Sequence, residues 1–251
     1  MPFAHLTTGA SLHYEAVGST DAPPVIVLHG LLGTARAHLS ALLGWLSADY
    51  RVYGPSLRGY GQSTPKPRDF PLDFYHRDAR DVIAFMDALK IERAHLLGYS
   101  DGGEVTLIVG GLAPQRCISL AAWGAVGYFG PAMRPLVQRM YPADWITREE
   151  IERSQIPDPN AFVLGWINAV KHMIDSGGDL SVSLAPQISA PVLLMLGAQD
   201  TLNPAAHAQR FLDQAPNGRL EMFNTGHAIH DADWPGFQRV VGAFLKAAAG
   251  R

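Results

Sequence analysis

The chain of 251 residues carries 20 basic and 23 acidic side chains, a formal net charge of −3, and 47% of its residues are hydrophobic. A chain this apolar and this weakly charged can bury a large core, which excludes global disorder. It has no basic clustering of the kind that nucleic acid binders use, and no run of about 18 apolar residues that could span a membrane. We therefore expect neither nucleic acid nor a membrane as a partner.

The single cysteine, Cys117, leaves no possibility of an internal disulfide, and the first residues lack the basic and apolar pattern of a secretory signal. Both features are typical of a cytoplasmic protein. We expect a soluble globular enzyme or ligand binder, a monomer or weak homodimer, whose partner is a small molecule.

The predicted strands are short, apolar and β-branched, and each is followed by turn-forming residues. They fall at residues 12–17, 25–28, 51–53, 94–97, 118–123, 192–196 and 220–223. Apolar residues at helical spacing predict helices over about residues 74–90 and 237–248. Strands that alternate with helices predict a mostly parallel sheet with helices on both faces.

Residues 126–186 interrupt this alternation, because they contain no convincing strand. Thr147 and Glu150 form a capping-box pattern that opens one helix, and residues 161–174 are amphipathic. We interpret residues 126–186 as a helical cap over the carboxyl edge of the sheet, where α/β folds bind ligands. The core is then made of residues 1–125 and 187–251.

The segment Gly98-Tyr99-Ser100-Asp101-Gly102 follows a predicted buried strand and precedes a predicted helix. A strand-to-helix turn this tight needs glycines beside its central residue, and it places the Ser100 hydroxyl above the sheet at a helix N-terminus. The pentapeptide alone could be a chance turn. The strand before it and the helix after it favour Ser100 as a catalytic nucleophile.

A serine nucleophile requires a base, and the base requires an orienting acid. Asp200 follows the predicted strand at 192–196, and His227 follows the one at 220–223. In isolation these would be a turn aspartate and a surface histidine. Their chain order and their positions after strand ends predict a triad of Ser100, Asp200 and His227.

The oxyanion hole is predicted from two backbone N–H groups. One belongs to Asp101, directly after the nucleophile, and the other to Leu31, in the His29-Gly30-Leu31 turn after the first buried strand. His29 could be mistaken for the base, but we expect it to brace this turn.

Other motifs give weaker signals. His227, His230, Asp231 and Asp233 lie close together, but no further ligand pair accompanies them, and we expect no metal. The Gly59-Tyr60-Gly61 turn lacks the third glycine of a phosphate-binding loop, so a structural turn is the better interpretation. No cofactor is expected.

Taken together, these motifs resemble the α/β-hydrolase superfamily over essentially the whole chain. A narrower resemblance is to the valacyclovir hydrolase (biphenyl hydrolase-like) group. It rests on Arg58-Gly59-Tyr60-Gly61, Arg68-Asp69-Phe70-Pro71, Arg77-Asp78-Ala79, Gly98 to Gly103, Trp123-Gly124-Ala125 and the pair His227 and His230.

This resemblance implies a serine esterase that hydrolyses α-amino-acid esters, with Asp101 binding the substrate ammonium. An acidic residue in the first turn of a helix is also favourable without any such role. Trp123, Tyr128 and Trp166 are candidates for lining the substrate pocket, although core packing is the better interpretation for each.

Other functions remain open on sequence grounds. A general carboxylesterase, a lactonase or a carbon–carbon bond hydrolase would use the same triad. A non-catalytic ligand receptor on this fold is a further alternative, because a fold does not fix a function.

Overall fold

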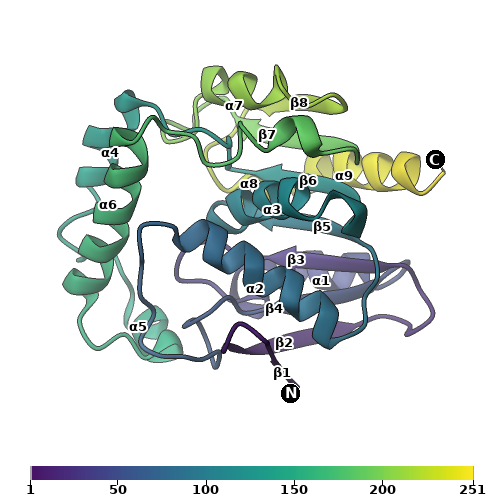
Figure 1. The fold of residues 1–251 in the computed structure, drawn as a ribbon, viewed down its shortest axis with the longest axis horizontal. Coiled ribbons are helices and arrows are strands. Elements are labelled where there is room, and N and C mark those ends of the chain that lie inside the picture. Colours follow the sequence, from purple (N-terminus) through teal and green to yellow (C-terminus); the bar gives the residue numbers. More distant parts are fainter. Residues whose placement is uncertain (1, 251) are drawn as a thin grey trace.

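The protein, in a computed structural model that describes residues 2–250, is built around one eight-stranded sheet (Figure 1). Its strands are β1 (Phe3–His5), β2 (Ser11–Val17), β3 (Pro24–Leu28), β4 (Arg51–Pro55), β5 (Ala94–Tyr99), β6 (Cys117–Trp123), β7 (Val192–Gly197) and β8 (Gly218–Phe223).

The strand order is β1-β2-β4-β3-β5-β6-β7-β8. β1 and β2 pair antiparallel with each other, β2 pairs antiparallel with β4, and all remaining neighbours are parallel. The carboxyl ends of β3, β5, β6, β7 and β8 therefore meet at one edge of the sheet, and this edge gathers the loops that carry the candidate site.

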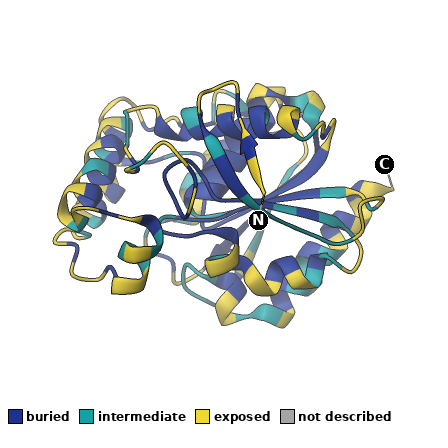
Figure 2. Cartoon of the chain, turned by 90° about the horizontal axis from the view of Figure 1, so that it is seen from below, coloured by how far each residue is buried: buried dark blue, intermediate teal, exposed yellow. Residues whose placement is uncertain are grey.

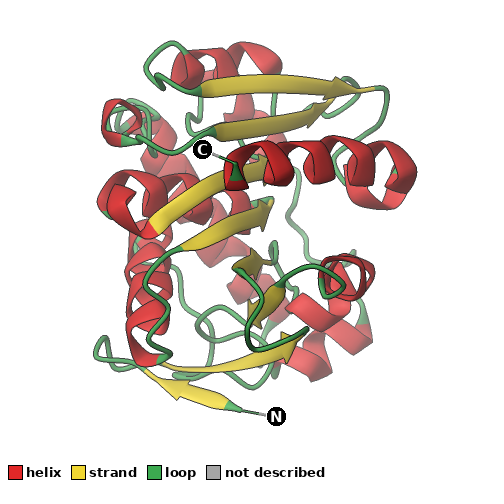
Figure 3. Ribbon diagram, turned by 90° about the vertical axis from the view of Figure 1, so that its right-hand side faces the viewer, coloured by secondary structure: helices red, strands yellow, loops and turns green. Residues whose placement is uncertain are grey.

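Helices cover both faces of the sheet (Figures 1 and 3). They are α1 (Ala35–Leu46), α2 (Phe74–Ala88), α3 (Asp101–Leu112), α4 (Arg134–Gln138), α5 (Arg148–Ser154), α6 (Pro159–Asp175), α7 (Ala205–Leu212), α8 (Ile229–Ala232) and α9 (Trp234–Ala249). Short 3-10 turns span Pro114–Arg116, Pro131–Met133 and Ala185–Gln187.

Alternating side chains of the central strands divide the core into two layers. In β3, Ile26 and Leu28 pack with residues of α2 and α3, whereas Val25 and Val27 pack with α1 and α9. This is the two-sided burial expected of a parallel sheet. In Figure 2, buried residues dominate the interior, and exposed residues lie mainly on the outer sides of the helices and in the loops.

Residues 126–186, called the helical segment below, hold α4, α5 and α6, which lie together beyond one end of the sheet (Figure 1). The predicted capping box is confirmed: the Thr147 hydroxyl accepts from the Glu150 N–H, and the Glu150 carboxylate accepts from the Thr147 N–H. No helix in residues 2–250 is long and apolar enough to cross a membrane.

All seven predicted strands are present, with ends shifted by a few residues. No pattern in the sequence predicted β1, α1, α7 or α8, and α4 was not predicted as a separate helix. β1 is only three residues long. For α1 a local signal was available, since the Thr34 hydroxyl accepts from the Ala37 N–H as an N-cap.

Candidate active site

Ser100 stands on a strained turn between β5 and α3. Its φ of 54° and ψ of −122° lie in a region that side-chain-bearing residues rarely adopt. Glycines on both sides make the turn possible. A Cβ on Gly98 would collide with the carbonyl of Gly102, and one on Gly102 would lie 2.6 Å from the carbonyl oxygen of His29. The turn thus has the form that the Gly-x-Ser-x-Gly pattern predicts.

The three residues of the predicted triad form one hydrogen-bonded chain. Ser100 Oγ lies 3.0 Å from His227 Nε2, and His227 Nδ1 lies 2.7 Å from Asp200 Oδ2. Asn203 donates from its side-chain amide to the same Asp200 oxygen at 3.0 Å. Burial alone would raise the pKa of Asp200, but the hydrogen bonds from His227 and Asn203 lower it below its ordinary value. Asp200 is therefore held as a carboxylate that faces the imidazole.

Leu31 and Asp101 present backbone N–H groups near the serine. Asp101 is the first residue of α3, so its N–H has no partner within the helix. The Leu31 N–H has no hydrogen-bond acceptor among residues 2–250. Gly30 brings its turn close to the nucleophile, since a Cβ there would lie 3.0 Å from Ser100 Cβ.

His29 braces the same turn. Its ring is fully buried, and its Nε2 accepts from the Leu57 N–H at 2.9 Å, so the ring proton resides on Nδ1 and is donated to the Gly30 carbonyl at 2.8 Å. Burial lowers the pKa of His29 to about 3, which keeps the imidazole neutral. The expectation that His29 supports the turn rather than acting as the base agrees with these contacts.

Asp101 points its carboxylate into the interior beside the serine. Its Oδ1 accepts from the Tyr75 hydroxyl at 2.6 Å, and its Oδ2 accepts from the Trp166 indole N–H at 3.2 Å. Burial raises the pKa of Asp101 to about 6, although these two hydrogen bonds and the charge of Arg68 oppose the increase. No basic side chain within residues 2–250 forms an ion pair with Asp101.

Glu104 lies one turn further along α3 and is also buried. Its two carboxylate oxygens accept from the N–H groups of Val126 and Gly127, at 2.8 and 3.0 Å. Burial raises the pKa of Glu104 to about 7, and the negative charge of Asp101 adds to this increase. The residue fixes the chain where it leaves β6 for the helical segment. This junction includes Gly124, whose backbone passes so close to His227 that a Cβ would lie 2.7 Å from the ring.

These side chains surround a small cavity of about 40 Å³. It is lined by Tyr75, Ser100, Asp101, Glu104, Gly124, Phe129, Met133, Val137, Trp166, Leu202, Asn203 and His227. Trp166, one of the candidates from the sequence, is among these lining residues.

Trp123 and Tyr128 are not among the residues that line this cavity. Trp123 is 0% exposed, donates its indole N–H to His230 Nδ1 at 3.0 Å, and packs in the core layer of α1 and α9. Tyr128 turns away toward α7, where the Arg210 guanidinium lies 4.3 Å from its ring centre. Trp123 is the last residue of β6, where the alternation of side chains along the strand directs it into the core, and Tyr128 lies in the loop after β6, whose course directs it toward α7.

Comparison with known proteins agrees with this geometry. A family model described as the alpha/beta hydrolase fold matches residues 23–158. Human serine hydrolase BPHL is 31% identical over 95% of this chain and 84% of the relative. The chain belongs to the α/β-hydrolase family.

Solved structures place this α/β hydrolase in the same fold. A hydrolase from Pseudomonas aeruginosa PA01 superposes with a TM-score of 0.75 and 26% identity, over 97% of each chain. The enol-lactonase from Burkholderia xenovorans LB400 gives a TM-score of 0.72 at 24% identity, over 98% of this chain and 100% of the other. The second likeness concerns the fold alone.

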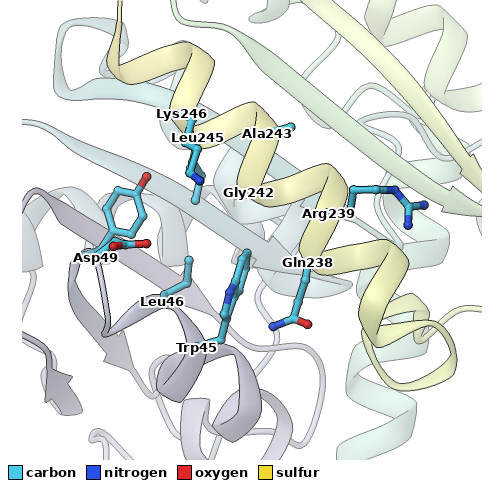
Figure 4. A pocket seen from close by; sticks show the side chains of 10 residues that line it. Trp45, Leu46, Asp49, Gln238, Arg239, Gly242, Ala243, Leu245 and Lys246 are labelled. Atoms are coloured by element: carbon cyan, nitrogen blue, oxygen red, sulfur yellow. The ribbon is translucent and has the colours of Figure 1, made fainter.

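A second hollow of the hydrolase, of about 350 Å³, lies between α1 and α9 (Figure 4). Trp45 and Leu46 of α1 face Gln238, Arg239 and Gly242 of α9 across it. It contains none of the three residues of the hydrogen-bonded chain. No group of three or more potential metal ligands occurs in residues 2–250.

The sequence did not predict three polar residues of the site, Tyr75, Glu104 and Asn203, or four apolar ones, Phe129, Met133, Val137 and Leu202. Glu104 had a signal, because a position three residues after Asp101 on a helix lies on the same face. Asn203 also had a signal, because it lies three residues after Asp200 in the same loop. Tyr75 had none, since its contact with Asp101 joins helices α2 and α3 across 26 residues.

Proposed function

We propose that this α/β hydrolase cleaves carboxylic esters, with Ser100 as nucleophile, His227 as general base and Asp200 as the orienting acid. The observation that carries the proposal is the continuous relay, 3.0 Å from Ser100 Oγ to His227 Nε2 and 2.7 Å from His227 Nδ1 to Asp200 Oδ2. These are the separations that proton transfer from a serine hydroxyl requires.

The reaction proceeds in two acyl transfers. His227 Nε2 takes the hydroxyl proton as Ser100 Oγ bonds to the ester carbonyl carbon. The carbon–oxygen bond to the alcohol then breaks, and the alcohol leaves with the proton from His227. A water molecule next gives a proton to His227 and adds its oxygen to the acyl carbon, which releases the acid and returns the proton to Ser100. The N–H groups of Leu31 and Asp101 stabilise the oxyanion of both tetrahedral intermediates.

We further propose that the substrates are esters of α-amino acids, whose ammonium group pairs with Asp101. A buried carboxylate without a cationic partner is costly, and a bound ammonium compensates its charge. Tyr75 and Trp166 hold one oxygen each and thereby fix the direction of the carboxylate. The similarity to human serine hydrolase BPHL supports a serine hydrolase of this kind.

The helical segment acts in this proposal as a cap. Met133, Val137 and Trp166 come from it, and all three line the cavity that also contains Ser100. Their buried side chains exclude water from the ion pair between the substrate and Asp101, which strengthens the pair.

The test combines active-site labelling with a substrate pair. The wild-type protein is expected to react with a fluorophosphonate probe, and Ser100→Ala to lose both the labelling and the hydrolysis of alanine p-nitrobenzyl ester. Wild-type kcat/KM is expected to be at least about tenfold higher for this ester than for its N-acetyl form, because only the free amine pairs with Asp101.

Unchanged hydrolysis by a folded Ser100→Ala protein would refute the nucleophile. Equal rates on the two esters would refute amine recognition and favour a general carboxylesterase. A wild-type protein that neither reacts with the probe nor cleaves either ester would be a ligand receptor.

A further inference from the structure

The cavity beside Ser100 is small as well as negatively charged. Its volume is about 40 Å³. One water needs about 10–15 Å³ measured this way, so the space holds roughly three such atoms. Pockets for drug-sized ligands are typically about 300–1,000 Å³. The cavity thus has room for only part of a substrate.

Asp101 determines which part of the substrate enters. In an α-amino-acid ester a single carbon separates the amine from the carbonyl carbon. Since Asp101 directly follows Ser100, an amine paired with its carboxylate places the acyl half of the ester in this cavity. The alcohol half then lies outside it.

The cavity walls are held in place on several sides. Phe129 donates its backbone N–H to the Gly178 carbonyl at 2.8 Å and packs edge-on against Tyr75. Trp166 is fixed by its hydrogen bond to Asp101. Met133 and Val137 are buried. A larger side chain would have to displace packed groups, and overpacking of this kind is unfavourable.

The charge of the cavity also restricts which acyl groups can enter it. Two buried carboxylates, Asp101 and Glu104, line it, and the only basic residue among the lining side chains is His227. Both carboxylates already accept two hydrogen bonds from the protein. A compact cation suits this lining, and an anionic acyl group is repelled by it.

We propose that the hydrolase is selective for esters of the smallest amino acids, glycine and alanine, because Phe129, Met133, Val137 and Trp166 close the acyl cavity around a short cationic group. Beyond the carbonyl carbon, a glycyl or alanyl group adds about two or three heavy atoms, which matches the space of roughly three water-sized atoms. A valyl group exceeds it, and a phenylalanyl group exceeds it severalfold. The inference rests on the proposed function, in which Asp101 receives the amine.

The test compares p-nitrobenzyl esters of glycine, alanine, valine and phenylalanine, which share one alcohol. Wild-type kcat/KM is expected to fall by about tenfold or more from alanine to valine, since one misfitting methylene alone changes discrimination by about 10–200-fold. The fall to phenylalanine is expected to be larger. Met133→Ala and Val137→Ala enlarge the cavity and are expected to raise the valine-to-alanine ratio of kcat/KM by about tenfold.

Leu164→Ala is the matched control, because Leu164 is on α6 of the same helical segment, is 37% exposed and does not line the cavity. Its substrate ratios are expected to equal those of the wild type. Comparable wild-type rates on alanine and phenylalanine esters would overturn the size limit while leaving the proposed function intact. Failure to cleave any of the four esters would instead refute the proposed function. The wild-type series decides the question even where an enlarged variant does not fold.

Discussion

The substitution Asp101→Asn is expected to stabilise the folded protein at alkaline pH. Asp101 is buried, and its pKa is raised from 3.8 to about 6 in the folded protein. The folded chain therefore binds this proton more tightly than the unfolded chain does. Its carboxylate leaves stability unaffected well below pH 3.8, and lowers it progressively as the pH rises through 3.8 to about 6 and beyond.

The size of the effect follows from the pKa. A rise from 3.8 to about 6 corresponds to about 3 kcal/mol between the two protonation states, at 1.36 kcal/mol for each pH unit. Asparagine mimics the neutral form and keeps both contacts, because its oxygen accepts from the Trp166 N–H while its amide donates to the Tyr75 hydroxyl. We expect Asp101→Asn to gain about 1–3 kcal/mol at pH 8, or about 3–10 °C in Tm for a chain of this length.

Urea unfolding at pH 8 and at pH 4 measures this gain. At pH 8 the variant is expected to unfold at higher urea, and at pH 4 most of this difference is expected to vanish, since Asp101 is then protonated in the folded protein and partly protonated in the unfolded chain. Asp21→Asn, at an exposed position of the loop before β3, controls for the loss of one surface charge. A variant no more stable than the wild type at pH 8, or equally stabilised at both pH values, would refute the argument from buried charge.

Two kinetic predictions concern the same cavity. Asp101→Asn is expected to lower kcat/KM for alanine p-nitrobenzyl ester by about tenfold or more and to leave the N-acetyl ester within about twofold, because only the free amine loses an ion pair; equal losses would assign Asp101 a purely structural role. Glu104→Gln leaves only one oxygen to accept from the two N–H groups of Val126 and Gly127. The junction against which His227 packs is then displaced, so kcat is expected to fall about tenfold on both esters. A loss confined to the free amine would show that Glu104 acts through its charge instead.

Asp101 and Glu104 illustrate how function and stability conflict in this site. Both carboxylates are buried with raised pKa values, and neither has an ion-pair partner among residues 2–250. Such groups lower the free energy of unfolding, and proteins retain them where binding or catalysis needs them. The free energy of unfolding that Asp101→Asn is predicted to gain is the stability that the protein loses by keeping a buried carboxylate for amine recognition.

The amino-acid sequence by itself determined the strands of the sheet, the tight turn at Ser100 and the chain order of Ser100, Asp200 and His227. These features are local or periodic: a buried strand shows as a continuous apolar run, and the turn at Ser100 needs Gly98 and Gly102 beside it. Because parallel strands end at one edge of a sheet, the positions of Asp200 and His227 after strand ends were enough to bring them near Ser100.

Only the tertiary structure decided which side chains form the cavity. Tyr75 reaches Asp101 from another helix, and Trp166 reaches it from α6 across 65 residues. The same long-range packing directs Trp123 into the core and Tyr128 toward α7, although both lie close to the site in sequence. Contacts of this kind depend on how helices pack on one another, and no local pattern of residues encodes that packing.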